Sequence, residues 1–178
     1  MFSKSFLSVL CVASVGVVLW VGFPSASAVT AQELSAPEGP ILLTVTGNIK
    51  STNAENAAVF DLAMLEALPM VEFETTTVWT EGTHTFQGVA LKDLIDILGV
   101  EGETLHATAV NDYGIDIPVS EIEKGGATLA YRMDGKTMSL RDKGPLWIVY
   151  PYDSEPAFRS EVIYSRSIWQ LDRIDARD

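Results

Sequence analysis

The nitrogen and sulfur side chains that bind transition metals are few and widely spaced in this sequence. His84 and His106 are the only histidines, and Cys11 is the only cysteine. Zinc and copper sites usually take three or more nitrogen or sulfur ligands. The sequence therefore indicates no metal site, and we expect each histidine to lie on a strand face beside a hydrogen-bond partner.

Oxygen ligands gather in one place, around an expected turn at 111–114. Asn111, Asp112 and Asp116 carry the amide and carboxylate oxygens that calcium prefers. Their spacing is not that of an EF-hand loop, however, and an Asn-Asp pair is also ordinary turn chemistry. Nucleophilic catalysis has less support, because the sequence contains no G-x-S-x-G elbow that would present an activated serine.

Aromatic residues in the expected loops and strand ends are the more suggestive candidates for ligand binding. Most of them must pack in the core. Tyr150 and Tyr152, however, lie where a strand runs into a long loop, and binding sites collect at such places. Arg159, Arg166 and Arg173 follow shortly after. An aromatic pocket with one or two arginines would suit a planar or anionic ligand.

The first 28 residues are typical of a secretory signal peptide. Lys4 precedes an apolar run at 6–21, and the small-residue pattern Ala26-Ser27-Ala28 follows. We expect cleavage after Ala28, or after Ala31 as a second choice, and a periplasmic or secreted protein. The apolar run is shorter than the ~20 residues of a spanning helix, which argues against an uncleaved anchor.

Cleavage would leave residues 29–40 as a flexible lead-in and 41–178 as a single domain. It removes Lys4 from the 12 basic residues, so 11 remain against 24 acidic residues, a net charge of −13. This charge argues against nucleic acid or an anionic membrane surface as a partner, and favours solubility or a cationic partner. The only cysteine leaves with the signal, so the domain must rely on its core rather than on disulfides.

Helix signals appear at three places. Apolar residues at i, i+3, i+4 and i+7 predict a helix over 91–98, which Gly99 ends in a left-handed conformation. A helix over 60–68 has Asp61 as its capping residue. An S-x-x-E capping box at 120–123 predicts a third helix of about one turn.

Runs of β-branched and apolar residues between turn signals predict the strands. The expected strands are 41–47, 71–80, 83–89, 104–110, 115–119, 127–133, 136–140, 146–150 and 162–175, with a long loop at 151–161. The elements do not alternate as β-α-β, and no glycine-rich phosphate loop follows a strand. The sequence therefore predicts a mixed α+β domain, dominated by sheet, with two or three short helices.

The stretch FETTTVWTEG, residues 73–82, does not fit a simple strand. Its β-branched and aromatic residues favour extended structure, but Thr75, Thr76 and Thr77 place hydroxyl groups on both faces. Two interpretations remain open: a well-hydrated edge strand, or the floor of a binding site.

Several stretches together resemble a known family. They are FQGVALKDLIDILGV (86–100), ATAVNDYGIDIPVSE (107–121), LAYRMDGKTMSLRDKGPLWIVYP (129–151) and SIWQLDRI (167–174). In order and spacing they are similar to the molybdopterin-binding oxidoreductase domain of the sulfite oxidase type, over roughly 41–174. The resemblance implies a mixed α+β fold and, in the enzymes, a pterin-bound molybdenum held by one cysteine thiolate.

Departures from the family pattern bear on its chemistry. The cysteine lies about twelve residues before Gly88 in the family, which corresponds to Thr76, and a hydroxyl is a far poorer molybdenum ligand than a thiolate. Trp147 replaces the family's arginine after G-P-L, and the glycine and lysine of the last loop are not evident. We therefore expect the fold without the molybdenum chemistry and with no cofactor, although the resemblance leaves molybdopterin as an alternative.

The sequence thus favours a ligand-binding or sensory accessory module. The predicted ligand-binding residues are Thr76, Trp79, Asp112, Tyr113, Tyr150, Tyr152 and Arg166. One alternative is a pterin-dependent oxidoreductase, and another is a filled pocket whose acidic surface docks on a membrane-bound signalling partner. The expected partners are therefore a small molecule or such a membrane-bound protein, with no nucleic acid and no stable membrane insertion after signal cleavage.

Overall fold

The computed structural model describes residues 34–123 and 125–178, and the expected signal peptide lies outside this part of the chain. Within it, no helix has both the length and the apolar character to cross a membrane. The strands are β1 (Leu43–Gly47), β2 (Ala58–Phe60), β3 (Met70–Thr76), β4 (Thr83–Ala90), β5 (Thr104–Ala109), β6 (Gly114–Pro118), β7 (Thr128–Met133), β8 (Lys136–Thr137), β9 (Leu146–Val149) and β10 (Trp169–Arg177). The α-helices are α1 (Leu62–Glu66), α2 (Leu91–Leu98) and α3 (Glu161–Ser165), and the 3-10 turns are η1 (Val119–Glu121), η2 (Leu140–Asp142) and η3 (Pro156–Phe158).

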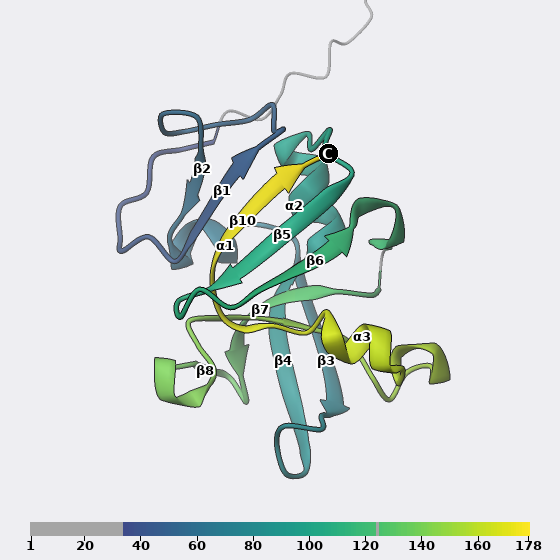
Figure 1. Ribbon diagram of the computed structural model, residues 1–178. Helices are drawn as coiled ribbons and strands as arrows, with labels where there is room; N and C mark the ends of the chain where they lie inside the picture. The colour runs from purple at the N-terminus through teal and green to yellow at the C-terminus, as the bar shows by residue number, and fades with distance from the viewer. Residues whose placement is uncertain (1–33, 124) are drawn as a thin grey trace, which may run out of the picture. The chain divides into compact units, whose positions relative to one another are not determined.

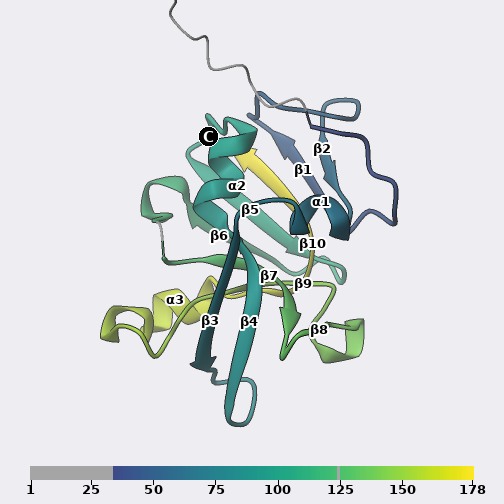
Figure 2. The same ribbon diagram turned by 180° about the vertical axis from the view of Figure 1, so that it is seen from behind.

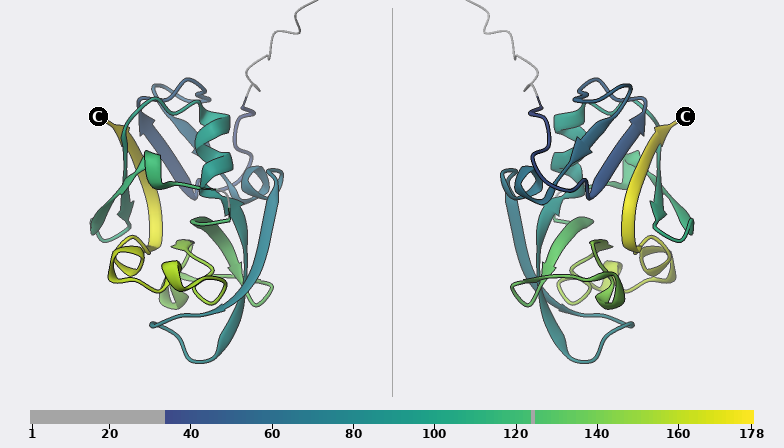
Figure 3. Two further views of the ribbon diagram at one scale, coloured as in Figure 1. Left: turned by 90° about the vertical axis from the view of Figure 1, so that its right-hand side faces the viewer. Right: turned by 90° about the vertical axis from the view of Figure 1, so that its left-hand side faces the viewer.

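All these strands belong to one sheet, in the order β2-β1-β10-β9-β7-β4-β3, and the sheet curls strongly (Figures 1 and 3). Strand β10 is its centre. It runs parallel to β1 and antiparallel to β5 and β9, while β6 continues from β5 and β8 from β7. The predicted fold class, a sheet-dominated α+β domain with few short helices, is confirmed.

Helix α2 forms where the apolar period predicts it. Leu91, Leu94, Ile95 and Leu98 are buried in the core, and Gly99 ends the helix at φ 60°. In the view of Figure 1, α1 and α2 lie behind β1, β10 and β5, and Figure 2 brings them to the front.

Helix α1 begins at the predicted cap. The Asp61 carboxylate accepts the Met64 N–H at 2.9 Å, and it also accepts the N–H groups of Glu38 and Gly39 at 2.8 Å each. These hydrogen bonds, that of Met64 first, lower the pKa of Asp61. The cap therefore also fixes the lead-in against the domain.

Several expected segments are wrong in their bounds or type. Strand β3 ends at Thr76 instead of Thr80, and the capping box at 120–123 gives only the 3-10 turn η1. The Val119 N–H bonds to the Glu103 carbonyl oxygen, so the chain is tied to its neighbour before a helix can develop. The long loop expected at 151–161 contains η3, and α3 takes the start of the last expected strand because Ser160 caps it.

Strand β10 contains a bulge near its start. Gln170 has a positive φ of 55° where the register with β9 shifts between Trp169 and Leu171, and the register with β5 shifts between Leu171 and Arg173. Leu171, Ile174 and Ala176 consequently all face the core. A regular alternation, which would place Gln170, Asp172 and Ile174 on one face, is therefore interrupted.

Candidate functional site

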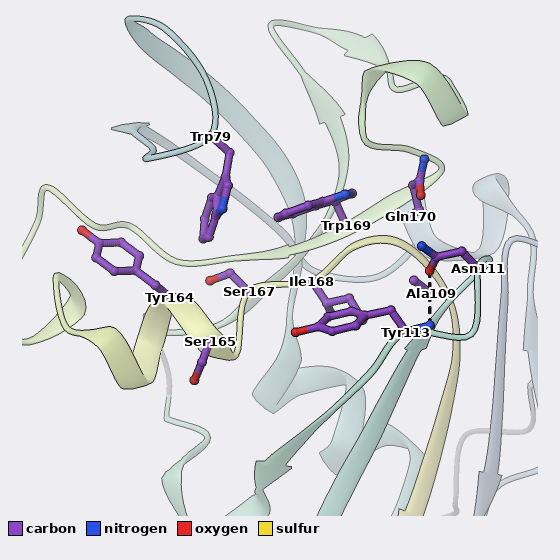
Figure 4. A pocket seen from close by; sticks show the side chains of 10 residues that line it. All are labelled: Trp79, Ala109, Asn111, Tyr113, Tyr164, Ser165, Ser167, Ile168, Trp169 and Gln170. Atoms are coloured by element: carbon purple, nitrogen blue, oxygen red, sulfur yellow. Dashed lines mark hydrogen bonds between the residues drawn. The ribbon is translucent and has the colours of Figure 1, made fainter.

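A cleft of about 290 Å³ opens where three segments meet (Figure 4). The segments are the loop after β3, the β5–β6 turn, and the end of α3 with the start of β10. The lining residues are Trp79, Ala109, Asn111, Tyr113, Tyr164, Ser165, Ser167, Ile168, Trp169 and Gln170. Among the described residues, none that line the cleft carries a formal charge, and four are aromatic.

Trp79 is directed inward by the threonines around it. The Thr77 hydroxyl oxygen accepts the Trp79 N–H at 3.1 Å and lies 2.8 Å from the Thr80 hydroxyl, which closes a tight turn after β3. The Trp79 ring centroid then lies 5.5 Å from that of Trp169 and 5.9 Å from that of Tyr164. These tilted and edge-on contacts are the geometries that aromatic pairs prefer.

Trp147 and Tyr152 support this wall from behind. Their ring centroids lie 6.0 and 6.1 Å from that of Trp79, and both side chains are buried. The Tyr152 hydroxyl lies 2.6 Å from the Ser167 hydroxyl, which lines the cleft. Burial raises the pKa of Tyr152 and raises the pKa of Tyr150 to about 12, so both phenols stay protonated near neutral pH.

The β5–β6 turn provides the opposite wall. Asp112 adopts a left-handed φ of 64°, and the Asn111 amide oxygen accepts the Tyr113 N–H at 3.2 Å. Tyr113 remains 59% exposed. Figure 4 shows its ring below the cleft, with Trp169 above.

The bulge at Gln170 joins the two walls. Its N–H bonds to the Lys143 carbonyl at 3.0 Å, and its carbonyl accepts the Val110 N–H at 2.8 Å. The side-chain Nε2 donates to the Leu140 carbonyl at 2.6 Å. The bulge thereby holds the β5–β6 turn and the η2 loop against the start of β10.

The predicted ligand-binding residues separate into distinct surroundings. Trp79 and Tyr113 line the cleft, Tyr152 reaches it through Ser167, and Tyr150 is buried against Tyr152 and Phe158. Thr76, Asp112 and Arg166 do not line it. Their side chains pair with Asp153, Arg173 and Glu121, respectively.

The Arg166 pairing removes the expected cation from the cleft. Its two terminal nitrogens bind the Glu121 carboxylate at 2.6 and 3.1 Å, and these bonds lower the pKa of Glu121. Sequence reasoning missed Tyr164, Asn111, Trp169 and Gln170 as lining residues. The β5–β6 turn, α3 and the bulge bring them to the cleft, and none of these segments has a clear periodic signal.

The histidines lie beside carboxylates, as expected. His84 Nδ1 is 2.8 Å from Asp134 Oδ2, and His106 Nδ1 is 2.7 Å from Asp116 Oδ1. Asp112 instead binds Arg173 at 2.8 Å. The carboxylates of Asp112 and Asp116, which the sequence offered as calcium ligands, therefore have different partners. Within the described part of the chain, no group of three or more histidine, cysteine or acidic residues is arranged to hold a metal.

A second hollow of about 580 Å³ lies between the lead-in, α1 and the β7–β8 region. Although it is larger, the carboxylate of Asp61 at its edge is already engaged by three N–H groups. The aromatic cleft, which is lined by four aromatic rings and by two of the predicted ligand-binding residues, Trp79 and Tyr113, is the better candidate site.

Comparison with known proteins identifies a family. The family model of the oxidoreductase molybdopterin-binding domain matches residues 43–153, which include β1 to β9 and the start of the loop after β9. None of the curated proteins compared with the sequence matches it. The matched region spans more than half of the chain, so the protein belongs to the oxidoreductase molybdopterin-binding domain family.

Proposed function

We propose that this protein is a ligand-binding module that uses its aromatic cleft without molybdenum chemistry. The observation that carries this proposal is the chemistry at Thr76, the position that corresponds to the family's cysteine. Thr76 donates from its N–H and its hydroxyl to the Asp153 carboxylate, at 2.6 and 3.1 Å. Its donors are therefore satisfied by a protein side chain.

The residues present do not fit a molybdenum–pterin group. Such a group needs a thiolate for its metal, and cations or N–H donors for its phosphate. Thr76 offers a hydroxyl, and the described cleft-lining residues include neither lysine nor arginine. The hydrogen bonds from Thr76 also lower the pKa of Asp153, so the carboxylate that engages Thr76 stays ionised, with Arg159 3.9 Å away.

The size of the cleft favours a small organic ligand. Ligand pockets in proteins usually measure roughly 300–1,000 Å³, and this cleft is at the lower end. Its walls are aromatic and its polar groups are uncharged. These properties support binding of a small, planar, uncharged molecule rather than a large charged cofactor.

The proposed location and partner rest on features of the sequence. The N-terminal pattern supports a periplasmic or secreted protein, and the net charge of −13 after cleavage supports an acidic surface for a membrane-bound signalling partner. A sensory role would combine ligand binding in the cleft with docking through that surface.

Family membership favours one alternative, a pterin-dependent oxidoreductase of the sulfite oxidase type.

The deciding experiment expresses the full chain in a molybdenum-replete host and purifies the exported protein. We expect far less than one molybdenum per chain by elemental analysis, and no visible or near-ultraviolet cofactor absorption. Stoichiometric molybdenum would overturn the proposed function.

A further inference from the structure

Two aromatic rings form the walls of a slot in the cleft. In Figure 4, Trp169 lies above and Tyr113 below, and Tyr164 and Trp79 close one side. Flat aromatic walls bind planar ring systems by stacking, with a strength that depends little on ring identity. The shape of the slot therefore selects a planar ring.

An unpartnered donor and an unpartnered acceptor lie at the other side of the slot. The Asn111 amide oxygen accepts the Tyr113 N–H, so the amide nitrogen Nδ2 is the free group. The Gln170 nitrogen Nε2 donates to Leu140, so the amide oxygen Oε1 is the free group. Neither free atom has a hydrogen-bond partner among the described residues, and Figure 4 shows both amides on the side opposite Tyr164.

This pair of atoms complements a ring edge that carries an acceptor next to a donor. The C(=O)–NH edge of a lactam, as in a nucleobase, meets this requirement, since its oxygen would accept from Asn111 and its N–H would donate to Gln170. A hydrocarbon ring would leave both amide atoms unpaired, which costs binding free energy.

Charge decides against a cationic ligand, and the arginines nearest in sequence are already engaged by carboxylates. The two arginines nearest in sequence to the lining residues, Arg166 and Arg173, are paired with Glu121 and Asp112. The Lys143 ammonium lies 4.7 Å from the Trp169 ring centroid, so this ring already holds a cation and a cationic ligand would be repelled.

We propose, resting on the ligand-binding function above, that the cleft binds an uncharged nucleobase or nucleoside. The ring stacks between Tyr113 and Trp169, and its lactam edge bonds to Asn111 and Gln170. The cleft of about 290 Å³ suits a molecule of this size.

The test is isothermal titration calorimetry with the purified exported protein. The probes are inosine, 1-methylinosine, inosine 5′-monophosphate and benzyltrimethylammonium. We expect inosine to bind. Methylation replaces the lactam N–H, so 1-methylinosine should bind roughly tenfold more weakly. The monophosphate should bind no more tightly than inosine, and the ammonium compound should bind more weakly than inosine.

Variants connect binding to the slot. Tyr113→Ala should weaken inosine binding roughly 5- to 150-fold, the range for loss of one stacking partner, whereas Tyr113→Phe keeps the ring and the affinity. Asn111→Asp keeps the oxygen that accepts from Tyr113 and replaces the free donor with an acceptor, so it should weaken inosine binding at least tenfold. Circular dichroism should show the same fold in all three, because both positions are exposed.

The outcomes separate the two proposals. Equal binding of inosine and 1-methylinosine, or inosine binding that does not depend on Tyr113, would overturn the nucleobase assignment. Binding of benzyltrimethylammonium that depends on Tyr113, without inosine binding, would also overturn it and leave the ligand-binding function standing. Absence of binding by every probe overturns the assignment, whereas the ligand-binding function falls only on stoichiometric molybdenum.

Discussion

Asp153 accepts two hydrogen bonds from Thr76, from the main-chain N–H at 2.6 Å and from the hydroxyl at 3.1 Å. The Asp153 N–H in turn donates to the Thr75 hydroxyl oxygen at 3.1 Å. Thr77 bonds to Thr80 and Trp79 and turns the chain. The three consecutive threonines thus have three roles, and the first two tie the end of β3 to the loop after β9.

The Thr76–Asp153 pair should make the stability of the fold decrease at acidic pH. The pKa of Asp153 is lower in the folded state, so its contribution is present above the unfolded pKa, about 4, and is lost as pH falls through the folded pKa. Asp153→Asn should lower the urea midpoint at pH 7 and flatten the acid dependence. The control is Glu155→Gln, which removes the same charge from an exposed neighbour. An equal fall of the urea midpoint in both variants would contradict a role for the Thr76–Asp153 pair.

Supplying the missing thiolate should not restore molybdenum binding. Thr76→Cys provides the ligand, but Asp153 and the uncharged lining remain. We expect molybdenum in this variant, measured by elemental analysis, to match that in the wild type and in Thr77→Cys. Stoichiometric molybdenum in Thr76→Cys alone would show that the thiolate is the only missing part.

Trp147 should be the most costly ring of the cleft wall to remove. It is fully buried, so Trp147→Ala should destabilise the fold by roughly 3–5 kcal/mol in urea unfolding. Its Nε1 has no hydrogen-bond partner within the described residues, so Trp147→Phe loses volume but no hydrogen bond and should cost clearly less. An equal loss of unfolding free energy in Trp147→Phe and Trp147→Ala would indicate that Nε1 has a hydrogen-bond partner.

Gln170→Gly should separate binding from folding. Glycine relieves the positive φ, which costs other residues about 1–2 kcal/mol, and it loses a hydrogen bond worth about 1 kcal/mol. The unfolding free energy should therefore change by no more than about 1 kcal/mol. Inosine affinity should fall in calorimetry, and unchanged affinity would exclude Gln170 as the acceptor.

Arg166 should not contribute to affinity for the cleft ligand. Its guanidinium is held by Glu121, and it does not line the cleft. Arg166→Met should leave the inosine dissociation constant unchanged, whereas Tyr113→Ala in the same assay weakens binding. A comparable loss in both variants would place the arginine in the site.

Local chemistry made part of the fold predictable. The stripe of α2 and the Asp61 cap depend on residues within one or two turns, and the structure contains both. The order of the expected strands and helices gave the fold class, and the family resemblance implied the same class, because the order of several motifs carries long-range information that a single motif lacks.

The cleft was only partly predictable, because contacts across the fold build it. Trp79 and Tyr113 were expected, but nothing in the local sequence indicates that Thr76 meets Asp153 or that Arg166 meets Glu121. The positive φ of Gln170 is similarly set by hydrogen bonds to Val110, Lys143 and Leu140.

The central position of β10 has a consequence for the order of folding. The other strands can pair earlier only as separate part-sheets, β1 with β2, β5 with β6, and β9 with β7, β4 and β3. Each part-sheet exposes an unpaired edge until β10 joins them, and such non-local closure is slow. Trp169 and Gln170 belong to this connecting strand, so the cleft is complete only once β10 has joined the sheet.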